Sequence, residues 1–227
     1  MNILAMDTSA DVLSLALCSP LGTQCIDIEG GSRHSELLMD WVDRILKSVL
    51  LEPEDLDLLA CMKGPGSFTG LRIGFSVAKG LSLALGIPMI AVSTLDCMAY
   101  SLSIWPGLVL PVLDAKKGCF FTALYRAGKR LSDYLDIAPE ALVSTLDTYK
   151  LNKEENVLVT GPGSELCISQ LKALHSENSI LVDPLFFRGR SLELLHIVKN
   201  TDTIDSYEGP YSAPLYIRRS DAEINRA

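Results

Sequence analysis

The chain has 227 residues, of which 48% are hydrophobic and 21% charged, and this composition excludes a disordered or low-complexity protein. A net charge of −8 disfavours a protein that binds DNA or tRNA unaided. The six cysteines form no Cys-x-x-Cys pair, and most lie in apolar runs, which is typical of free thiols in a reducing compartment. With no leader-like start and no run of eighteen apolar residues, the sequence predicts a cytoplasmic protein without membrane contact.

Hydrophobic periodicity in the first hundred residues changes from that of strands to that of helices after residue 32. The expected elements are strands at 2–6, 12–18 and 23–29, a helix at 33–50, a strand at 58–62, a helix at 69–85, a strand at 88–92 and a short helix from residue 93. Ser32 or Ser35 can cap the first helix, and Glu36 suits the positive end of its dipole.

The second half repeats this order. Its expected elements are strands at 108–113, 119–126 and 131–137, a helix at 139–146, a strand at 157–160 and a helix that opens at Gly161-Pro162-Gly163-Ser164. Asp114 repeats Asp7, and the second Gly-Pro-Gly-Ser repeats the one at 64–67, at nearly equal offsets.

These two repeats predict a duplicated βββαβα unit. A carboxylate that ends the first strand of such a unit indicates the ribonuclease-H-like fold, an α/β architecture that is duplicated in actin, hexokinase and Hsp70 (the ASKHA fold). We expect an N-terminal domain at 1–102, joined by the C-terminal segment 203–227, and a smaller or degenerate second domain at 103–202.

Two motifs are candidates for phosphate chemistry. Asp7, Thr8 and Ser9 follow the first strand, and such oxygen donors suit a hard cation or a phosphate; the alternative is an Asx or Ser/Thr turn. The glycine-rich run 64–70 precedes a helix, where backbone N–H groups can converge on an anion, although no Walker A lysine follows. The candidate remnant of a phosphate site comprises Asp7, Thr8, Ser9, Gly64, Gly66, Ser67, Thr69 and Gly70.

Small residues recur every four positions along the second helix, in the stripes Gly70/Gly74/Ala78/Ser82 and Ser76/Gly80/Ala84. Such a face allows another backbone to approach closely, and either a partner protein or the chain's own sheet can supply it.

Metal and nucleophile motifs are missing from the sequence. The three histidines, His34, His175 and His196, have no metal-binding spacing, and Ser67 is not in a nucleophile elbow. His34 beside Glu36 is typical of a helix start with solvated side chains rather than of an acid–base pair.

Four segments closely resemble the TsaB (YeaZ) family: Met6–Ser9, Ser32–Leu38, Lys63–Gly74 and Ala91–Leu95. The run 64–74 is the most specific, and the likeness covers residues 1–100, with a weaker match at Pro214–Arg218. The resemblance implies a bacterial protein needed to make N6-threonylcarbamoyladenosine (t6A), next to the anticodon of tRNAs that read codons beginning with A.

The resemblance also implies the partners: TsaD, which is the catalytic paralogue, TsaE, which is an ATPase, and a second copy of the chain in isolation. Thr94 and Met98 stand where the paralogue has metal-binding histidines, so the resemblance implies no metal, no catalytic residue and no cofactor of its own, save a nucleotide at a partner interface. Contact with tRNA would then be indirect, through the complex.

We expect the partner interface to use the helices at 33–50 and 69–85. Its candidate residues are Arg33, His34, Glu36, Met39, Gly70, Arg72, Gly74, Ala78 and Ser82. The alternative function is a stand-alone enzyme, either an ATP-dependent phosphotransferase or a glycoprotease-type peptidase. A further alternative is direct tRNA contact through Arg218, Arg219 and Arg226, although three arginines beside Asp221 and Glu223 are more often a solvated tail.

Overall fold

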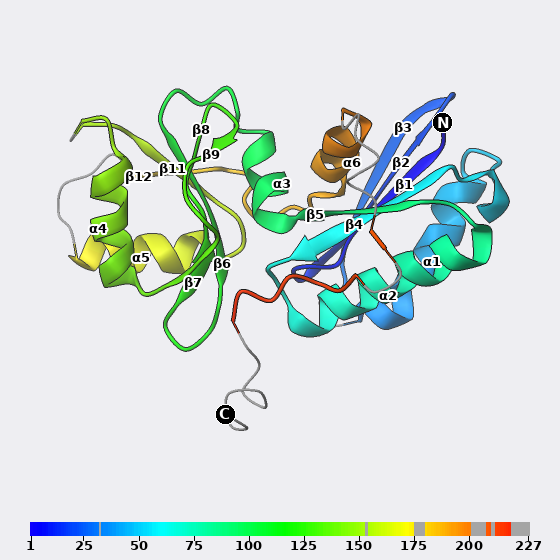
Figure 1. Ribbon diagram of the computed structural model, residues 1–227, viewed down its shortest axis with the longest axis horizontal. Helices are drawn as coiled ribbons and strands as arrows, with labels where there is room; N and C mark the ends of the chain where they lie inside the picture. Colours follow the sequence, from blue (N-terminus) through cyan, green and yellow to red (C-terminus); the bar gives the residue numbers. More distant parts are fainter. Residues whose placement is uncertain (32, 153, 175–179, 201–207, 210–211, 219–227) are drawn as a thin grey trace. The chain divides into compact units, whose positions relative to one another are not determined.

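The computed structural model describes residues 1–31, 33–152, 154–174, 180–200, 208–209 and 212–218, which form two compact units (Figure 1). Unit 1 comprises Met1–Cys97 and Arg188–Pro214, and unit 2 comprises Met98–Phe187 and Leu215–Ala227. Each unit has its own sheet and its own apolar core.

The sheet of unit 1 has the strand order β3-β2-β1-β4-β5. Its strands are β1 (Ile3–Asp7), β2 (Val12–Ser19), β3 (Gly22–Glu29), β4 (Leu58–Gly64) and β5 (Met89–Ser93). The first three strands pair antiparallel, which confirms the predicted meander, and β4 and β5 add in parallel beside β1.

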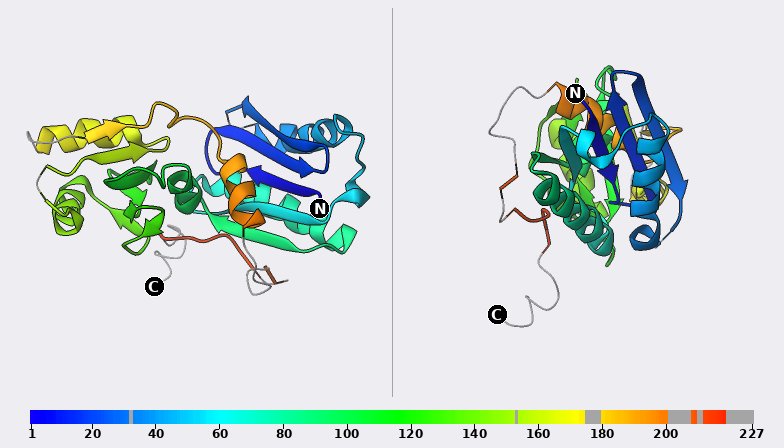
Figure 2. Two further views of the ribbon diagram at one scale, coloured as in Figure 1. Left: turned by 90° about the horizontal axis from the view of Figure 1, so that it is seen from above. Right: turned by 90° about the vertical axis from the view of Figure 1, so that its right-hand side faces the viewer.

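Helices lie on both faces of this sheet (Figures 1 and 2). The helical elements of unit 1 are α1 (His34–Lys47), η1 (Pro53–Asp55), α2 (Phe68–Leu85), α6 (Ser191–Lys199) and the start of α3 (Thr94–Tyr100). Successive residues of a strand face opposite sides, so Leu4 and Met6 pack with α1 and α2, whereas Ile3 and Ala5 pack with α6. Arg33 is the N-cap of α1 without a side-chain hydrogen bond; Ser35 lies inside the helix, and Ser32 is outside the described residues.

Unit 2 repeats the topology with the order β10-β7-β6-β11-β12, again three antiparallel strands followed by two parallel ones. Its strands are β6 (Leu108–Asp114), β7 (Phe120–Thr122), β8 (Tyr125–Arg126), β9 (Lys129–Arg130), β10 (Leu135–Ile137), β11 (Val157–Thr160) and β12 (Ile180–Val182). The helices α4 (Pro139–Tyr149) and α5 (Ser164–Leu174) pack against each other over the core. Asp7 and Asp114 end equivalent strands, and the duplication is confirmed.

Two strands of unit 2 differ from the prediction. The expected strand 119–126 is broken into β7 and β8, which pair with different parts of β6, at 112–114 and at Val109. Only 135–137 of the expected strand 131–137 is extended in the main sheet, because Leu131 instead donates its N–H to the carbonyl of Leu124 at 2.7 Å. Neither β12 nor α6 was expected from the sequence.

The units also divide the chain differently from the expected domains. α6 belongs to unit 1, because Leu194, Leu195 and Val198 fill the second core of its sheet. Glu208 also joins unit 1, where it accepts a hydrogen bond from Lys63 at 2.6 Å. Leu215 onward belongs to unit 2. Much of the expected joining segment, at 203–207, 210–211 and 219–227, lies outside the described residues.

In the described part of the chain, no helix combines the length and the apolar character needed to span a membrane. All six cysteines are free thiols, and four of them (Cys18, Cys61, Cys97 and Cys167) are buried, which agrees with the expectation from the sequence.

Candidate functional site

The end of β1 and the glycine run before α2 meet in one corner of unit 1, as the predicted phosphate remnant requires. Asp7, Thr8 and Ser9 are almost fully buried there. One carboxylate oxygen of Asp7, Oδ1, accepts hydrogen bonds from the backbone N–H of Ser9 at 2.9 Å and from its hydroxyl at 2.6 Å. This is the geometry of an Asx turn, the alternative interpretation of the motif.

The other polar groups of the corner bind each other. The Thr8 hydroxyl donates to the carbonyl of Gly70 at 2.7 Å, and the N–H of Ser67 donates to the carbonyl of Ser9 at 2.8 Å. Ser67 caps α2 by accepting the N–H of Gly70 at 3.2 Å. Thr69 is exposed, and Gly64 ends β4.

The glycines of the run serve this close packing. A Cβ at Gly66 would lie 2.5 Å from the carbonyl oxygen of Ser9, and one at Gly70 would lie 2.0 Å from that of Thr8. Two carbonyl oxygens therefore occupy the space in front of the glycines, and their negative partial charge repels an anion. Six of the eight predicted residues come together, the exceptions being Gly64 and the exposed Thr69, but the corner in this form does not fit a phosphate.

A buried charge cluster completes the corner, and sequence reasoning missed it. The second carboxylate oxygen of Asp7, Oδ2, accepts the backbone N–H of Arg190 at 2.9 Å. Arg190 is 1% exposed, and its guanidinium lies 3.4 Å from Oε1 of Glu193, which also pairs with Arg188. The only signal of this cluster in the sequence was the close spacing of Arg188, Arg190 and Glu193 beside the apolar stripe of α6.

Cys97 lies next to this cluster. Burial raises the pKa of its thiol well above the usual value, and the carboxylates of Asp7, Asp96 and Glu193 raise it further. A thiol in this environment stays protonated and is a poor nucleophile.

One small-residue stripe of α2 faces the chain's own sheet. Gly70, Gly74 and Ala78 are buried, and a Cβ at Gly74 would lie 2.3 Å from the Thr8 hydroxyl. The other stripe, Ser76, Gly80 and Ala84, is exposed, and a Cβ at Gly80 would meet nothing within 4 Å. The sequence left the occupant of both stripes open; the chain's own structure packs against the first stripe, and the second is exposed.

The residues predicted for the partner interface divide into buried and exposed side chains. His34 is also buried, with Nε2 lying 2.7 Å from the carbonyl oxygen of Ala10, and Ser82 is half-buried with its hydroxyl on the carbonyl of Ile87. With Gly70, Gly74 and Ala78, these side chains are engaged inside unit 1. The predicted residues at the surface are Arg33, Glu36, Met39 and Arg72.

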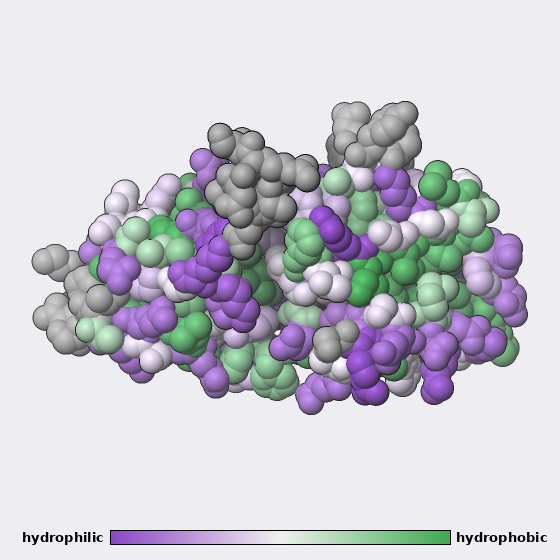
Figure 3. Space-filling view, turned by 90° about the horizontal axis from the view of Figure 1, so that it is seen from below, coloured by the Kyte–Doolittle hydropathy of each residue, from purple (hydrophilic) through white to green (hydrophobic). Residues whose placement is uncertain are grey.

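Hydrophobic surface gathers over unit 1 on the side where α1 and α2 lie (Figure 3). Met39 of α1 is 48% exposed, and Leu83 of α2 is 71% exposed. Further apolar side chains of the two helices are half-buried: Leu37, Trp41, Ile73, Val77 and Leu81. We call the exposed surface of α1 and α2 the helical face; apolar surface of this kind is typical of a protein-binding site.

The predicted tRNA-binding arginines are only partly described. Arg218 forms a bidentate pair with Asp136, at 2.5 and 2.6 Å, and donates to the carbonyl of Ala115 at 2.9 Å. Its guanidinium is thereby committed within unit 2 and is poorly placed to bind RNA phosphate. Arg219 and Arg226 lie outside the described residues.

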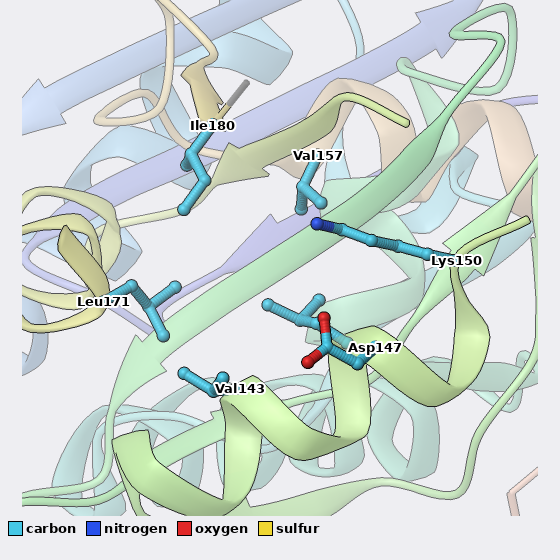
Figure 4. Close-up of a pocket in the computed structure, with 7 residues that line it drawn as sticks. Val143, Asp147, Lys150, Val157, Leu171 and Ile180 are labelled. Carbon is cyan, nitrogen blue, oxygen red and sulfur yellow. The ribbon is translucent and has the colours of Figure 1, made fainter. Parts of the chain in front are cut away.

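The described residues contain no cluster of metal ligands. Thr94 and Met98 of α3 are both buried, and no group of three or more His, Cys, Asp or Glu in the described residues is placed to hold a metal ion. A pocket in unit 2, between α4, α5 and β11, holds about one water molecule, too little for a cofactor (Figure 4). It is lined by Val143, Leu146, Asp147, Lys150, Val157, Leu171 and Ile180.

Comparison with known proteins identifies relatives along the whole chain. Residues 29–198 match the family described as TsaD, tRNA N6-adenosine threonylcarbamoyltransferase. The chain is 31% identical to the tRNA threonylcarbamoyladenosine biosynthesis protein TsaB of Bacillus subtilis, over 98% of this chain and 96% of that protein.

Solved structures agree on the fold. YeaZ from Pseudomonas aeruginosa superposes with a TM-score of 0.75 at 20% identity, covering 95% of this chain and all of that one. A Bacteroides thetaiotaomicron protein with an actin-like ATPase fold and unknown function gives 0.50 at 9% identity, over 88% of this chain and 96% of that one. The predicted ASKHA class is thus confirmed.

Proposed function

Because the chain belongs to the TsaB (YeaZ) family, we propose that it serves tRNA threonylcarbamoyladenosine biosynthesis in the cytoplasm as a non-catalytic partner of the TsaD transferase. The observation that carries this proposal is the 31% identity to a TsaB protein along 98% of the chain. In this role the chain presents a surface to TsaD, needs no cofactor of its own and contacts tRNA only through the complex.

The corner of unit 1 supports a non-catalytic role. Both carboxylate oxygens of Asp7 accept hydrogen bonds from the chain itself, and the Thr8 hydroxyl is held by the carbonyl of Gly70. A phosphotransferase would need these groups to face a nucleotide. No contact of the described residues favours a stand-alone phosphotransferase or peptidase.

The helical face supports a partner-binding role. An exposed helix of small side chains, Ser76, Gly80 and Ala84, next to the apolar Leu83, allows a partner helix to approach closely. Met39 on α1 adds an unbranched side chain that adapts to the shape of a partner. We propose that TsaD and a second copy of the chain use this face, and that TsaE joins the assembled pair.

The proposal is tested by reconstituting t6A formation from TsaD, TsaE, tRNA, threonine, bicarbonate and ATP, with and without this chain. We expect modified tRNA only when the chain is present, and no ATP or peptide hydrolysis by the chain alone. Full t6A formation without the chain, or turnover of ATP by the isolated chain, would contradict the proposal.

A matched pair of variants tests the surface. Ser76→Arg places a long cation on the exposed side of α2, and Ser144→Arg makes the same change on the exposed side of α4 in unit 2. We expect the first to abolish co-elution with TsaD in size-exclusion chromatography and the second to leave it intact. Equal binding by both variants would move the interface away from α2.

A further inference from the structure

The start of α6 is held in the corner of unit 1 by side chains from three strands. The N–H of Gly189 donates to Asp27 on β3 at 3.1 Å, and the N–H of Arg190 donates to Asp7 on β1 at 2.9 Å. The hydroxyls of Ser191 and Ser14, on β2, lie 2.6 Å apart. The segment 188–191 is therefore seated on the sheet, almost two hundred residues away from β1 along the chain.

Only glycine allows this seating. A Cβ at position 189 would lie 2.1 Å from the Cβ of Ser14 and 2.9 Å from a carboxylate oxygen of Asp27. The backbone at Gly189 therefore lies in direct contact with Ser14 on β2, with no room for a side chain between them.

Charged side chains accompany the segment into the corner. Asp7 and Glu193 bring two carboxylates into the interior, with exposed fractions of 2% and 3%, and Arg190 brings one buried guanidinium group. Arg188, whose side chain is 28% exposed, pairs with Glu193 from nearer the surface. Burying a single charge is strongly unfavourable, so the buried carboxylate of Glu193 needs the guanidinium of Arg190 as its partner.

A metal-bound nucleotide, which enzymes of this architecture hold at the end of β1, does not fit these residues. The oxygens of Asp7 are engaged, carbonyl groups face the glycine run, and the fully buried Arg190 already supplies positive charge beside the carboxylate of Glu193. We propose that Arg190 is a built-in cation, which neutralises the buried carboxylate of Glu193 at this corner so that unit 1 is complete without a metal or a nucleotide.

The experiment removes this cation and supplies it from solution. Arg190→Ala leaves the buried carboxylate of Glu193 without this cation, and we expect the full-length variant to melt roughly 10 °C below the wild type. Millimolar guanidinium chloride should restore part of this loss, whereas sodium chloride at equal ionic strength should not, and neither salt should stabilise the wild type. Arg44→Ala, at an exposed position of α1, is the control that should melt normally without either salt.

A variant that melts like the wild type would overturn the proposal, and so would a destabilised variant that guanidinium fails to restore. If Arg190→Ala does not fold, Arg190→Met alone and with Glu193→Gln decides the question. We expect the double variant to melt above Arg190→Met, because it removes the carboxylate together with its cation. An equal or lower melting temperature would overturn the proposal.

Discussion

Two glycines of α2 offer a direct test of how the helix is packed. Gly74 lies against Thr8 and Gly80 faces open space, so Gly→Ala adds the same methyl group to the inner and the outer side of one helix. Alanine favours a helix over glycine by about 0.5–1 kcal/mol at both positions, and this gain cancels in the comparison. The difference between the two variants therefore reports the packing at Gly74.

The size of the effect follows from the contacts. The new Cβ would lie 2.3 Å from the Thr8 hydroxyl, and overpacking of this kind costs about 1–3 kcal/mol. Moving Thr8 away would also break its hydrogen bond to Gly70, which contributes about 1 kcal/mol. We expect Gly74→Ala to be less stable than Gly80→Ala by about 2–4 kcal/mol.

Urea unfolding of the full chain, followed by circular dichroism, measures both free energies of unfolding. Gly80→Ala should be more stable than the wild type and Gly74→Ala less stable. Equal stability of the two variants would show that α2 does not pack against β1 as described.

Three further predictions concern the cap of α2, the buried thiols and the C-terminal arginine. Ser67→Ala should lower the free energy of unfolding by about 1 kcal/mol in urea titrations, and Ser67→Asn should retain the cap; equal loss in both variants would contradict this. Burial raises the pKa values of Cys61 and Cys167 to about 12, so their protonated thiols should resist alkylation at pH 8 until urea unfolds the chain. The contribution of this shift to the free energy of unfolding is complete below pH 9 and is lost as the pH rises towards 12. Rapid labelling of the native protein at these thiols, detected by mass spectrometry, would refute the assignment. Arg218→Ala should destabilise unit 2 by about 1–2 kcal/mol in thermal unfolding, because it removes the pair with Asp136. The salt dependence of tRNA binding to the complex should not change, and a changed salt dependence would show that Arg218 contacts tRNA phosphate.

Local patterns were sufficient to predict most of the fold. Alternating and periodic apolar residues placed β1, β2, β3 and the two long helices of unit 1 within a few residues of their bounds. The strands of unit 2 were predicted less well, because β8 and β9 contain only two residues each and their pairing depends on distant parts of β6.

The site was predicted only in part, for a related reason. The motif residues Thr8 and Gly70 do meet, but whether they face a ligand or each other depends on distances that sequence does not encode. Arg190 reaches Asp7 from the far end of the chain, and only the folded structure reveals that contact. Gly74 was expected at a partner interface because small-residue spacing is the same for contacts within and between chains.

The discontinuity of unit 1 has a consequence for the order in which the protein is made. A ribosome releases β1 to β5 long before α6, so the strand face that carries Ile3 and Ala5 is uncovered while residues 98–187 are synthesised. Most of unit 2 lies in that one continuous stretch and can complete its core first, whereas unit 1 must wait for contacts of high sequence separation. The N-terminal half of the nascent chain therefore carries the longer-lived exposed apolar surface, and it is the half that would most need protection by a chaperone.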